Sequence, residues 1–305
     1  MSEQRHDLPG EVVVGVDESD ESRAAAGWAA AEAVRLGTGL VLASAYTVPH
    51  RGLLAYDVMA PDYGSILRER QQQRHRDIAG ELLDLHPGLP ISSTVETGHP
   101  VDVLLGRSAG AAMLVVSTRE RGRVRRAVGG SVAQALAAHA TVPVAVIRPG
   151  VTGERNGPVV VGVDGSANSR PAVAAAFDAA AARGAELIAL HAWHDDMTLD
   201  IDERGLVGAE IGDDALREIE RALVSEELAG WSERYPDVVV RTEVRKGDPA
   251  TLLLGSAAAA SLLVVGSRGR GGFRGALLGS TSQELIMHAD APVLVVRSAE
   301  PADEN

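Results

Sequence analysis

Three short polar stretches in the second half of the chain hold residue types that bind phosphate. They are Asp164-Gly165-Ser166, Gly266-Ser267-Arg268-Gly269 and Gly279-Ser280-Thr281-Ser282. Glycine lets backbone N–H groups approach a ligand without a Cβ in between. A glycine followed by hydroxyl residues at the start of a helix offers unpaired N–H donors and the positive end of the helix dipole. We therefore expect an anion cradle, most simply for phosphates, to which the hydroxyls of Ser280, Thr281 and Ser282 add donors.

The elements that would position these stretches alternate between strand and helix. Continuous apolar runs predict strands buried on both faces at Val159–Val163, Glu186–His191, Val238–Val244, Leu262–Val265 and Val293–Val296. The segments between them predict helices at about Ser169–Arg183, Asp213–Tyr235, Pro249–Ala259 and Ser280–His288. This alternation predicts parallel strands joined by right-handed crossovers, in an α/β, doubly wound (Rossmann-like) fold. Ligands bind beyond the carboxyl ends of the strands in such sheets, and there the three stretches lie.

The chain is also an internal repeat. Val12-Val13-Val14-Gly15-Val16-Asp17 recurs as Val159-Val160-Val161-Gly162-Val163-Asp164, and Gly130-Ser131 recurs as Gly279-Ser280. Agreement over half of the chain predicts two copies of one domain. Pro and Gly cluster around residues 148–154, so we place the boundary there. The first copy is then residues 1–152, and the second copy is residues 153–305.

Composition excludes several classes of protein. The formal net charge of −13 leaves no basic footprint for nucleic acid or an anionic membrane. The absence of cysteine excludes disulfides, thiolate metal sites and a cysteine nucleophile. The single lysine, Lys246, precedes Gly247-Asp248 and does not fit a P-loop. Residues 1–10 lack the apolar part of a signal peptide and no apolar stretch is long enough to span a bilayer, so we expect a cytoplasmic protein.

Two further features of the second copy are interpreted as structural. His191 and His194 have no accompanying cluster of metal ligands, so we expect no metal site of the protein's own. The acidic stretch Glu210–Glu227 is interpreted as a solvated helix face.

The spacing Gly266-x2-Gly269-x9-Gly279-Ser280, downstream of Asp164, resembles the nucleotide motif of ATP-binding universal stress proteins. The resemblance covers nearly the whole chain, as a tandem two-domain member. It implies a five-stranded parallel sheet in each copy, with ATP and Mg²⁺ at the strand ends. It implies that Asp164 lies near the ribose, the backbone near Ala192 near the adenine, and Gly266, Gly269, Gly279, Ser280 and Thr281 around the phosphates. Gly165, Ser166, Ser267, Arg268 and Ser282 complete the candidate binding set. The resemblance also implies association through the last strands, Val144–Ile147 and Val293–Val296, either in a homodimer or within one chain.

The first copy keeps only part of this motif. Asp17, Gly130 and Ser131 are retained, whereas Ser117 and Glu120 replace Gly266 and Gly269. A carboxylate beside a triphosphate repels it unless a cation intervenes. The arginines around Glu120 would pair either with it or with phosphates, or form a solvated loop. Nucleotide binding by the first copy is therefore left open.

The resemblance implies an ATP-binding stress-response protein, and we expect the nucleotide to be a regulatory ligand. No general base or nucleophile accompanies the motif, so we expect no enzyme, although slow ATP hydrolysis is compatible with the motif. One alternative is a nucleotide-free dimerisation or interaction module, in which the glycines only form turns and the hydroxyls only cap helices. Another is an enzyme that adenylates its substrate.

Overall fold

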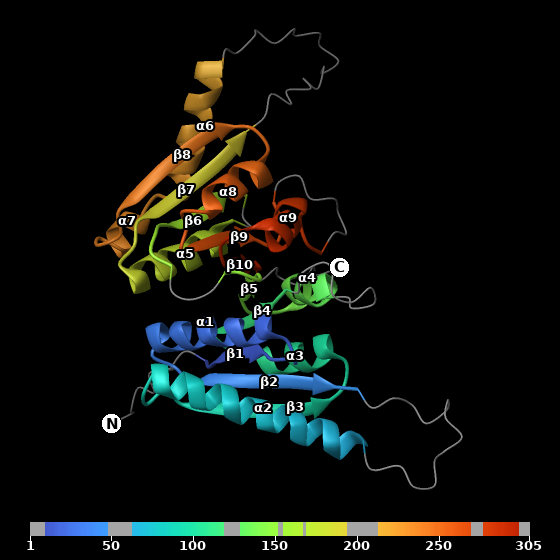
Figure 1. Ribbon diagram of the computed structural model, residues 1–305. Coiled ribbons are helices and arrows are strands. Elements are labelled where there is room, and N and C mark those ends of the chain that lie inside the picture. Colours follow the sequence, from blue (N-terminus) through green and yellow to red (C-terminus); the bar gives the residue numbers. More distant parts are fainter. Residues whose placement is uncertain are drawn as a thin grey trace, which may run out of the picture.

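The computed structural model describes residues 10–47, 63–118, 129–151, 155–166, 169–193, 213–269 and 277–298. Within these ranges, ten strands form one sheet in the order β3-β2-β1-β4-β5-β10-β9-β6-β7-β8 (Figure 1). The first copy contributes β1 (Val12–Gly15), β2 (Leu40–Tyr46), β3 (Ile91–Thr97), β4 (Met113–Ser117) and β5 (Val144–Ile147). The second copy contributes β6 (Val159–Val163), β7 (Leu187–Trp193), β8 (Val240–Lys246), β9 (Leu262–Gly266) and β10 (Val293–Val296).

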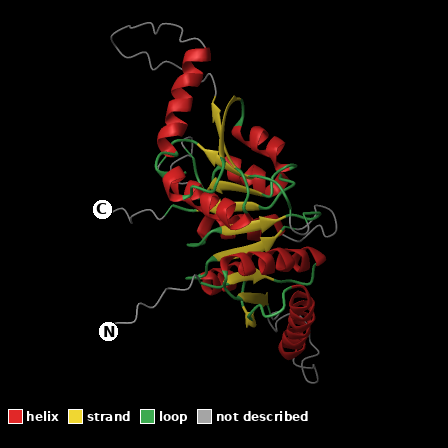
Figure 2. Cartoon of the chain, turned by 90° about the vertical axis from the view of Figure 1, so that its left-hand side faces the viewer, coloured by secondary structure: helices red, strands yellow, loops and turns green. Residues whose placement is uncertain are grey.

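Helices cover both faces of this sheet (Figure 2). One face packs against α1 (Asp20–Leu36), α2 (Tyr63–Leu85), α5 (Arg170–Arg183), α6 (Asp213–Glu227) and α7 (Trp231–Arg234). The other face packs against α3 (Pro100–Ser108), α4 (Gly129–His139), α8 (Pro249–Ala257) and α9 (Ser280–His288). Alternate strand residues face the two layers, because successive side chains of a strand point to opposite sides. In β1, for example, Val12 and Val14 face the first helix layer and Val13 faces the second. The predicted α/β, Rossmann-like fold is confirmed.

The two copies join through their last strands. Within each copy all strands are parallel, but β10 pairs antiparallel with β5, with Val293 opposite Val146 and Val295 opposite Val144. The last strands of the two copies thus pair within one chain, which is one of the two forms of association expected. Pairing between two chains stays a prediction, and the predicted boundary between residues 152 and 153 lies outside the described residues.

Side chains reinforce this seam between the copies. Arg148 donates to Ala289 O at 3.1 Å, and its repeat equivalent Arg297 donates to Ala138 O at 2.8 Å. Each arginine therefore reaches the carboxyl end of the last helix in the other copy, where a cation meets the negative end of the helix dipole. On the opposite face Glu32 of α1 is 3% exposed and pairs with Arg183 of α5.

Two predicted elements of the second copy differ in the structure. The helix predicted over 213–235 is divided into α6 and α7 by Gly230, whose φ of +80° lies in the left-handed region. This turn brings Trp231 onto Phe177, with ring centroids 5.2 Å apart. The strand predicted over 238–244 as buried on both faces is instead the edge strand β8, and Val239 before it is 68% exposed.

Candidate functional site

The three polar stretches of the second copy meet at the carboxyl ends of β6 and β9. The 164–166 loop follows β6, and the 266–269 loop follows β9, which lies parallel beside it. The loops touch, because a Cβ placed on Gly269 would lie 2.7 Å from Asp164 Oδ2. A side chain at position 269 would displace that carboxylate. Glycine is therefore the residue that lets the 266–269 loop pass close to Asp164.

The start of α9 is fastened to the 266–269 loop. Gly279 N–H donates to Ser267 O at 2.8 Å, and the Ser282 hydroxyl donates to Gly266 O at 2.7 Å. Ser267 N–H donates in turn to Val296 O at 2.8 Å. Ser267 and Ser282 are both 3% exposed, so they build the loop from within. The predicted donation of the Ser282 hydroxyl to phosphate stays a prediction, and it requires that hydroxyl to exchange its bond to Gly266 O for one to the ligand.

The first turn of α9 has the properties of an anion site. Gly279 precedes the helix in extended conformation, with φ −71° and ψ 154°, and no side chain in the described part of the chain caps it. The first N–H groups of a helix have no partner within the helix. Ser280 is exposed and Thr281 is half-buried, so both hydroxyls lie at the surface of this turn. Arg268 lies beside it, since a Cβ on Gly279 would be 3.5 Å from the Arg268 Cα.

The 164–166 loop turns on its own aspartate. Asp164 Oδ1 accepts the Ser166 N–H at 2.9 Å, and Gly165 between them has a φ of +71°. This conformation favours glycine because it brings a Cβ too close to the backbone. The Ser166 hydroxyl is buried and meets no hydrogen-bond partner among the described residues. An unpaired buried hydroxyl is costly unless a ligand or a water satisfies it.

Ala192 lies one residue before the end of β7, paired in register with Arg245 of β8. The next residue, Trp193, is 5% exposed, and its buried indole Nε1 has no hydrogen-bond partner in the part of the chain that the structure describes. Lys246 Nζ lies 5.2 Å from the centroid of the Trp193 ring. The end of β7 therefore also presents an unpaired donor next to the position expected to face an adenine.

Helix α6 contributes two carboxylates that the sequence interpretation placed in solvent. Glu220 Oε2 lies 2.8 Å from His191 Nε2, and Glu227 Oε2 accepts the Gly165 N–H at 2.9 Å. The solvated interpretation of 210–227 is therefore wrong for these two residues. Their spacing with the fully buried Val224 places all three on one helix face, and that periodicity was the signal available in the sequence.

The first copy has different chemistry at the equivalent sheet end. Asp17 Oδ1 accepts the Ser19 N–H at 2.8 Å, and Arg74 of α2 donates to Ser19 O at 2.5 Å. Burial, and secondarily the charge of Arg74, lower the pKa of His75 from 6.5 to about 4. Ser117 ends β4, and Gly130 and Ser131 lie in the first turn of α4, whereas Glu120 and its neighbouring arginines lie outside the described residues.

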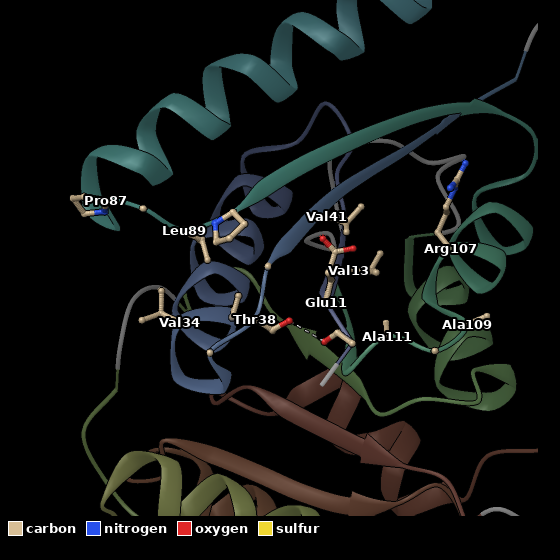
Figure 3. Close-up of a pocket in the computed structure, with 17 residues that line it drawn as sticks. Glu11, Val13, Val34, Thr38, Val41, Pro87, Leu89, Arg107, Ala109 and Ala111 are labelled. Atoms are coloured by element: carbon tan, nitrogen blue, oxygen red, sulfur yellow. Dashed lines mark hydrogen bonds between the residues drawn. The ribbon is translucent and has the colours of Figure 1, made fainter. Parts of the chain in front are cut away.

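A pocket of about 760 Å³ lies at the other end of the first copy's strands (Figure 3). Gly10, Gly39 and Pro90 line it just before β1, β2 and β3, and Thr38 donates to Gly10 O at 3.2 Å. The pocket therefore lies at the amino ends of the strands. We place the candidate site at the carboxyl ends of the second copy, where glycines, a helix N-terminus and unpaired polar atoms converge.

Neither a membrane span nor a metal-ligand cluster is found in the described ranges. None of the helices there is both long and apolar enough to cross a bilayer. No group of three or more His, Asp or Glu side chains in the same ranges is arranged to hold a metal ion.

Comparison with known proteins places the repeat in a family. The profile of the Universal stress protein family matches residues 10–148 and again residues 156–297. The chain belongs to the universal stress protein family. A universal stress protein of Mycolicibacterium smegmatis is 36% identical over 303 residues, covering 94% of this chain and 96% of the relative. One from Mycobacterium tuberculosis is 37% identical over 312 residues, covering 97% of each chain.

The fold is shared with a solved structure of this family. The crystal structure of a universal stress protein from Archaeoglobus fulgidus matches with a TM-score of 0.67 and 18% identity, covering 98% of this chain and 99% of that one. The fold is thus common to this chain and that structure over nearly the full length of both.

Proposed function

We propose that the second copy of this universal stress protein binds ATP, with the phosphates on the first turn of α9. The observation that carries the proposal is the uncapped N-terminus of α9 beside Arg268 and Gly269. The resemblance of the glycine spacing to ATP-binding members of the family supports the choice of nucleotide. The unpaired Ser166 hydroxyl and Trp193 indole N–H add two donors for the rest of the ligand.

The nucleotide acts in this proposal as a regulatory ligand. The carboxylates of Asp164 and Glu227 both accept backbone N–H groups of the 164–166 loop, which supports a structural role for them in this proposal. Mg²⁺ would enter with the phosphates of ATP. Binding would order the 164–166 and 266–269 loops. It would shift assembly or partner binding to the extent that ATP binds one conformation of the protein more tightly than another.

Isothermal titration of the full chain with ATP and Mg²⁺ tests the proposal. Gly279→Glu puts a carboxylate beside the phosphates, and the backbone tolerates it, because φ is −71° and a Cβ there makes ordinary contacts of 3.5 Å. We expect this variant to weaken ATP binding at least about a hundredfold, because like charges meet in a partly desolvated site. The Asp164→Ala variant should weaken it less.

The first copy supplies the matched controls. Gly130→Glu and Asp17→Ala should leave the affinity of the second copy unchanged, and the stoichiometry of the wild type reports whether the first copy binds as well. Absence of saturable binding by the wild type at millimolar ATP and Mg²⁺ would overturn the proposal. That outcome would favour a nucleotide-free interaction module of the same fold.

A further inference from the structure

The last residue of α6 ties that helix to the loop after β6. Glu227 Oε2 accepts the Gly165 N–H at 2.9 Å, and Glu227 Oε1 contacts the Ser169 hydroxyl. Ser169 directly precedes α5, is 3% exposed, and its hydroxyl and N–H lie 2.9 and 3.1 Å from Ser166 O. One carboxylate therefore links the 164–166 loop, the start of α5 and the end of α6.

The rest of α6 keeps Glu227 in this place. Glu220, Val224 and Glu227 follow one another on one helix face, and Val224 is fully buried. Glu220 Oε2 lies 2.8 Å from His191 Nε2, while His191 Nδ1 lies 2.7 Å from Val163 O. Helix α6 is thus fixed to β7 by one carboxylate and to the loop after β6 by the other.

This arrangement is particular to the second copy. In the first copy the loop after β1 is held by a cation, because Arg74 of α2 donates to Ser19 O at 2.5 Å, and Ser19 is the repeat equivalent of Ser166. An arginine holds the loop through a carbonyl, whereas Glu227 holds it through an N–H. The two loops therefore present different backbone groups to their surroundings.

We propose that Glu227 is a positioning residue of the ATP site, which it serves by holding the 164–166 loop in its ligand-ready conformation. This inference rests on the proposed function. Asp164 and Ser166 flank the N–H that Glu227 accepts, and Gly165 is held in the left-handed region. Release of that N–H frees the loop to leave this conformation, so the ordering of Asp164 and Ser166 has to be supplied by the ligand.

Substitutions at Glu227 separate position from charge. Glu227→Ala should weaken ATP binding about tenfold, the loss expected for one charge-assisted hydrogen bond that preorganises a loop. Glu227→Gln should stay within about threefold of the wild type, because its amide oxygen accepts the Gly165 N–H and its NH₂ donates to the Ser169 hydroxyl. The exposed neighbour Glu226 gives the control, since Glu226→Ala should leave the affinity unchanged. Equal ATP affinities for Glu227→Ala and the wild type would overturn the inference. Tighter ATP binding by both Glu227 variants would overturn it too, because it would show that the carboxylate repels the nucleotide.

Amide hydrogen exchange in the ligand-free protein provides a readout that does not depend on ATP. The Gly165 amide should exchange at least about tenfold faster in Glu227→Ala than in the wild type or Glu226→Ala, while amides of the β6 interior keep their protection. Faster exchange together with a wild type that binds no ATP would show that the tie exists but that the proposed function fails. If the wild type binds ATP and Glu227→Ala changes neither the exchange of the Gly165 amide nor the affinity for ATP, only the positioning role is overturned.

Discussion

The two copies satisfy the same backbone carbonyl with different side chains. In the first copy the Ser44 hydroxyl donates to Val16 O at 2.5 Å and lies 2.7 Å from His75 Nε2 of α2. In the second copy His191, the repeat equivalent of Ser44, approaches Val163 O with Nδ1, and its Nε2 meets a carboxylate of α6. The histidine at this site thus comes from a helix, α2, in the first copy and from a strand, β7, in the second.

This exchange changes the hydrogen-bond partners at the two sheet ends. Since Ser44 donates its proton to Val16 O, it accepts from His75 Nε2–H, and the buried His75 Nδ1 meets no hydrogen-bond partner among the described residues. The two ring nitrogens of His191 instead face a backbone carbonyl and a carboxylate. The comparison teaches that a repeat conserves its backbone hydrogen bonds while the partners that complete them differ.

The largest effect on the free energy of unfolding should come from the buried ion pair across the seam, which only one copy can form with its acidic residue. Glu32 pairs with Arg183 and, at 2.7 Å, with Arg35, while its repeat equivalent is Ala179, so no reciprocal pair can form. Glu32→Ala should lower the free energy of unfolding by about 3–5 kcal/mol, because it removes the carboxylate that neutralises the buried Arg183 guanidinium. Urea unfolding measures the loss. Glu81→Ala, which breaks the exposed pair with Arg23, should lower it by less than about 1 kcal/mol, and equal losses would contradict the description of the seam.

The next effect is a pH dependence that belongs to the first copy. Because the pKa of His75 is lowered to about 4, mainly by burial, the unfolded chain binds a proton between pH 4 and 6.5 that the folded chain does not. The contribution of His75 therefore leaves the free energy of unfolding at its full value above pH 6.5. It lowers this free energy as the pH falls from 6.5 to 4, and below pH 4 the loss stays constant. The full change is about 3 kcal/mol. Unfolding free energies of the wild type at pH 7, 5.5 and 4.5 measure it.

A His75→Gln variant isolates this effect from the carboxylates, which also titrate in acid. The difference between wild type and variant should shrink as the pH falls through this window. Parallel pH profiles for the two proteins would mean that His75 is not held neutral in the folded state.

The smallest effect should be the one that is equal in the two copies. Arg148→Ala and Arg297→Ala each remove an arginine hydrogen bond to the last helix of the other copy. Arg148→Ala also removes an ion pair of 3.7 Å with Asp290, which contributes little because that carboxylate is exposed. Each should lower the free energy of unfolding by about 1 kcal/mol, and the two losses should agree within about 0.5 kcal/mol. Thermal or urea unfolding of both variants measures this. A large loss of unfolding free energy at one site only would show that the two arginines do not contribute equally, although the backbone pairing of β5 and β10 is symmetric.

The sequence was sufficient for the elements whose signals are local. The strand at Val159–Val163 and the helix at Ser280–His288 were predicted with their observed bounds, because a β-branched run and a glycine before hydroxyl residues are encoded in neighbouring residues. The convergence of the three polar stretches was predictable as well, since parallel strands end at the same edge of a sheet.

What could not be predicted depends on residues far apart in the chain. The bond from Gly165 to Glu227 spans 62 residues. The spacing of Glu220, Val224 and Glu227 places them on one helix face, but it does not tell which loop that face meets. The run at 238–244 begins with three valines, which favours a buried strand, but Arg241 and Glu243 within it fit the edge of the sheet, where the order of the strands places it. Similarly, the sequence does not indicate whether β5 pairs with β10 of the same chain or with β10 of a second chain.

The antiparallel seam also has a consequence for the biosynthesis of the protein. Val144–Ile147 is an apolar strand whose outer edge is covered by β10 alone, and β10 is made last, almost the whole length of a copy later. At roughly 5–20 residues per second the ribosome needs about 10–30 s to complete it. Throughout that interval a nascent chain displays a bare Val-Ala-Val-Ile edge, which is the kind of surface through which chains on one polysome aggregate. Joining both copies in one polypeptide limits that interval to the time of a single translation event, whereas separate subunits would have to wait for an encounter.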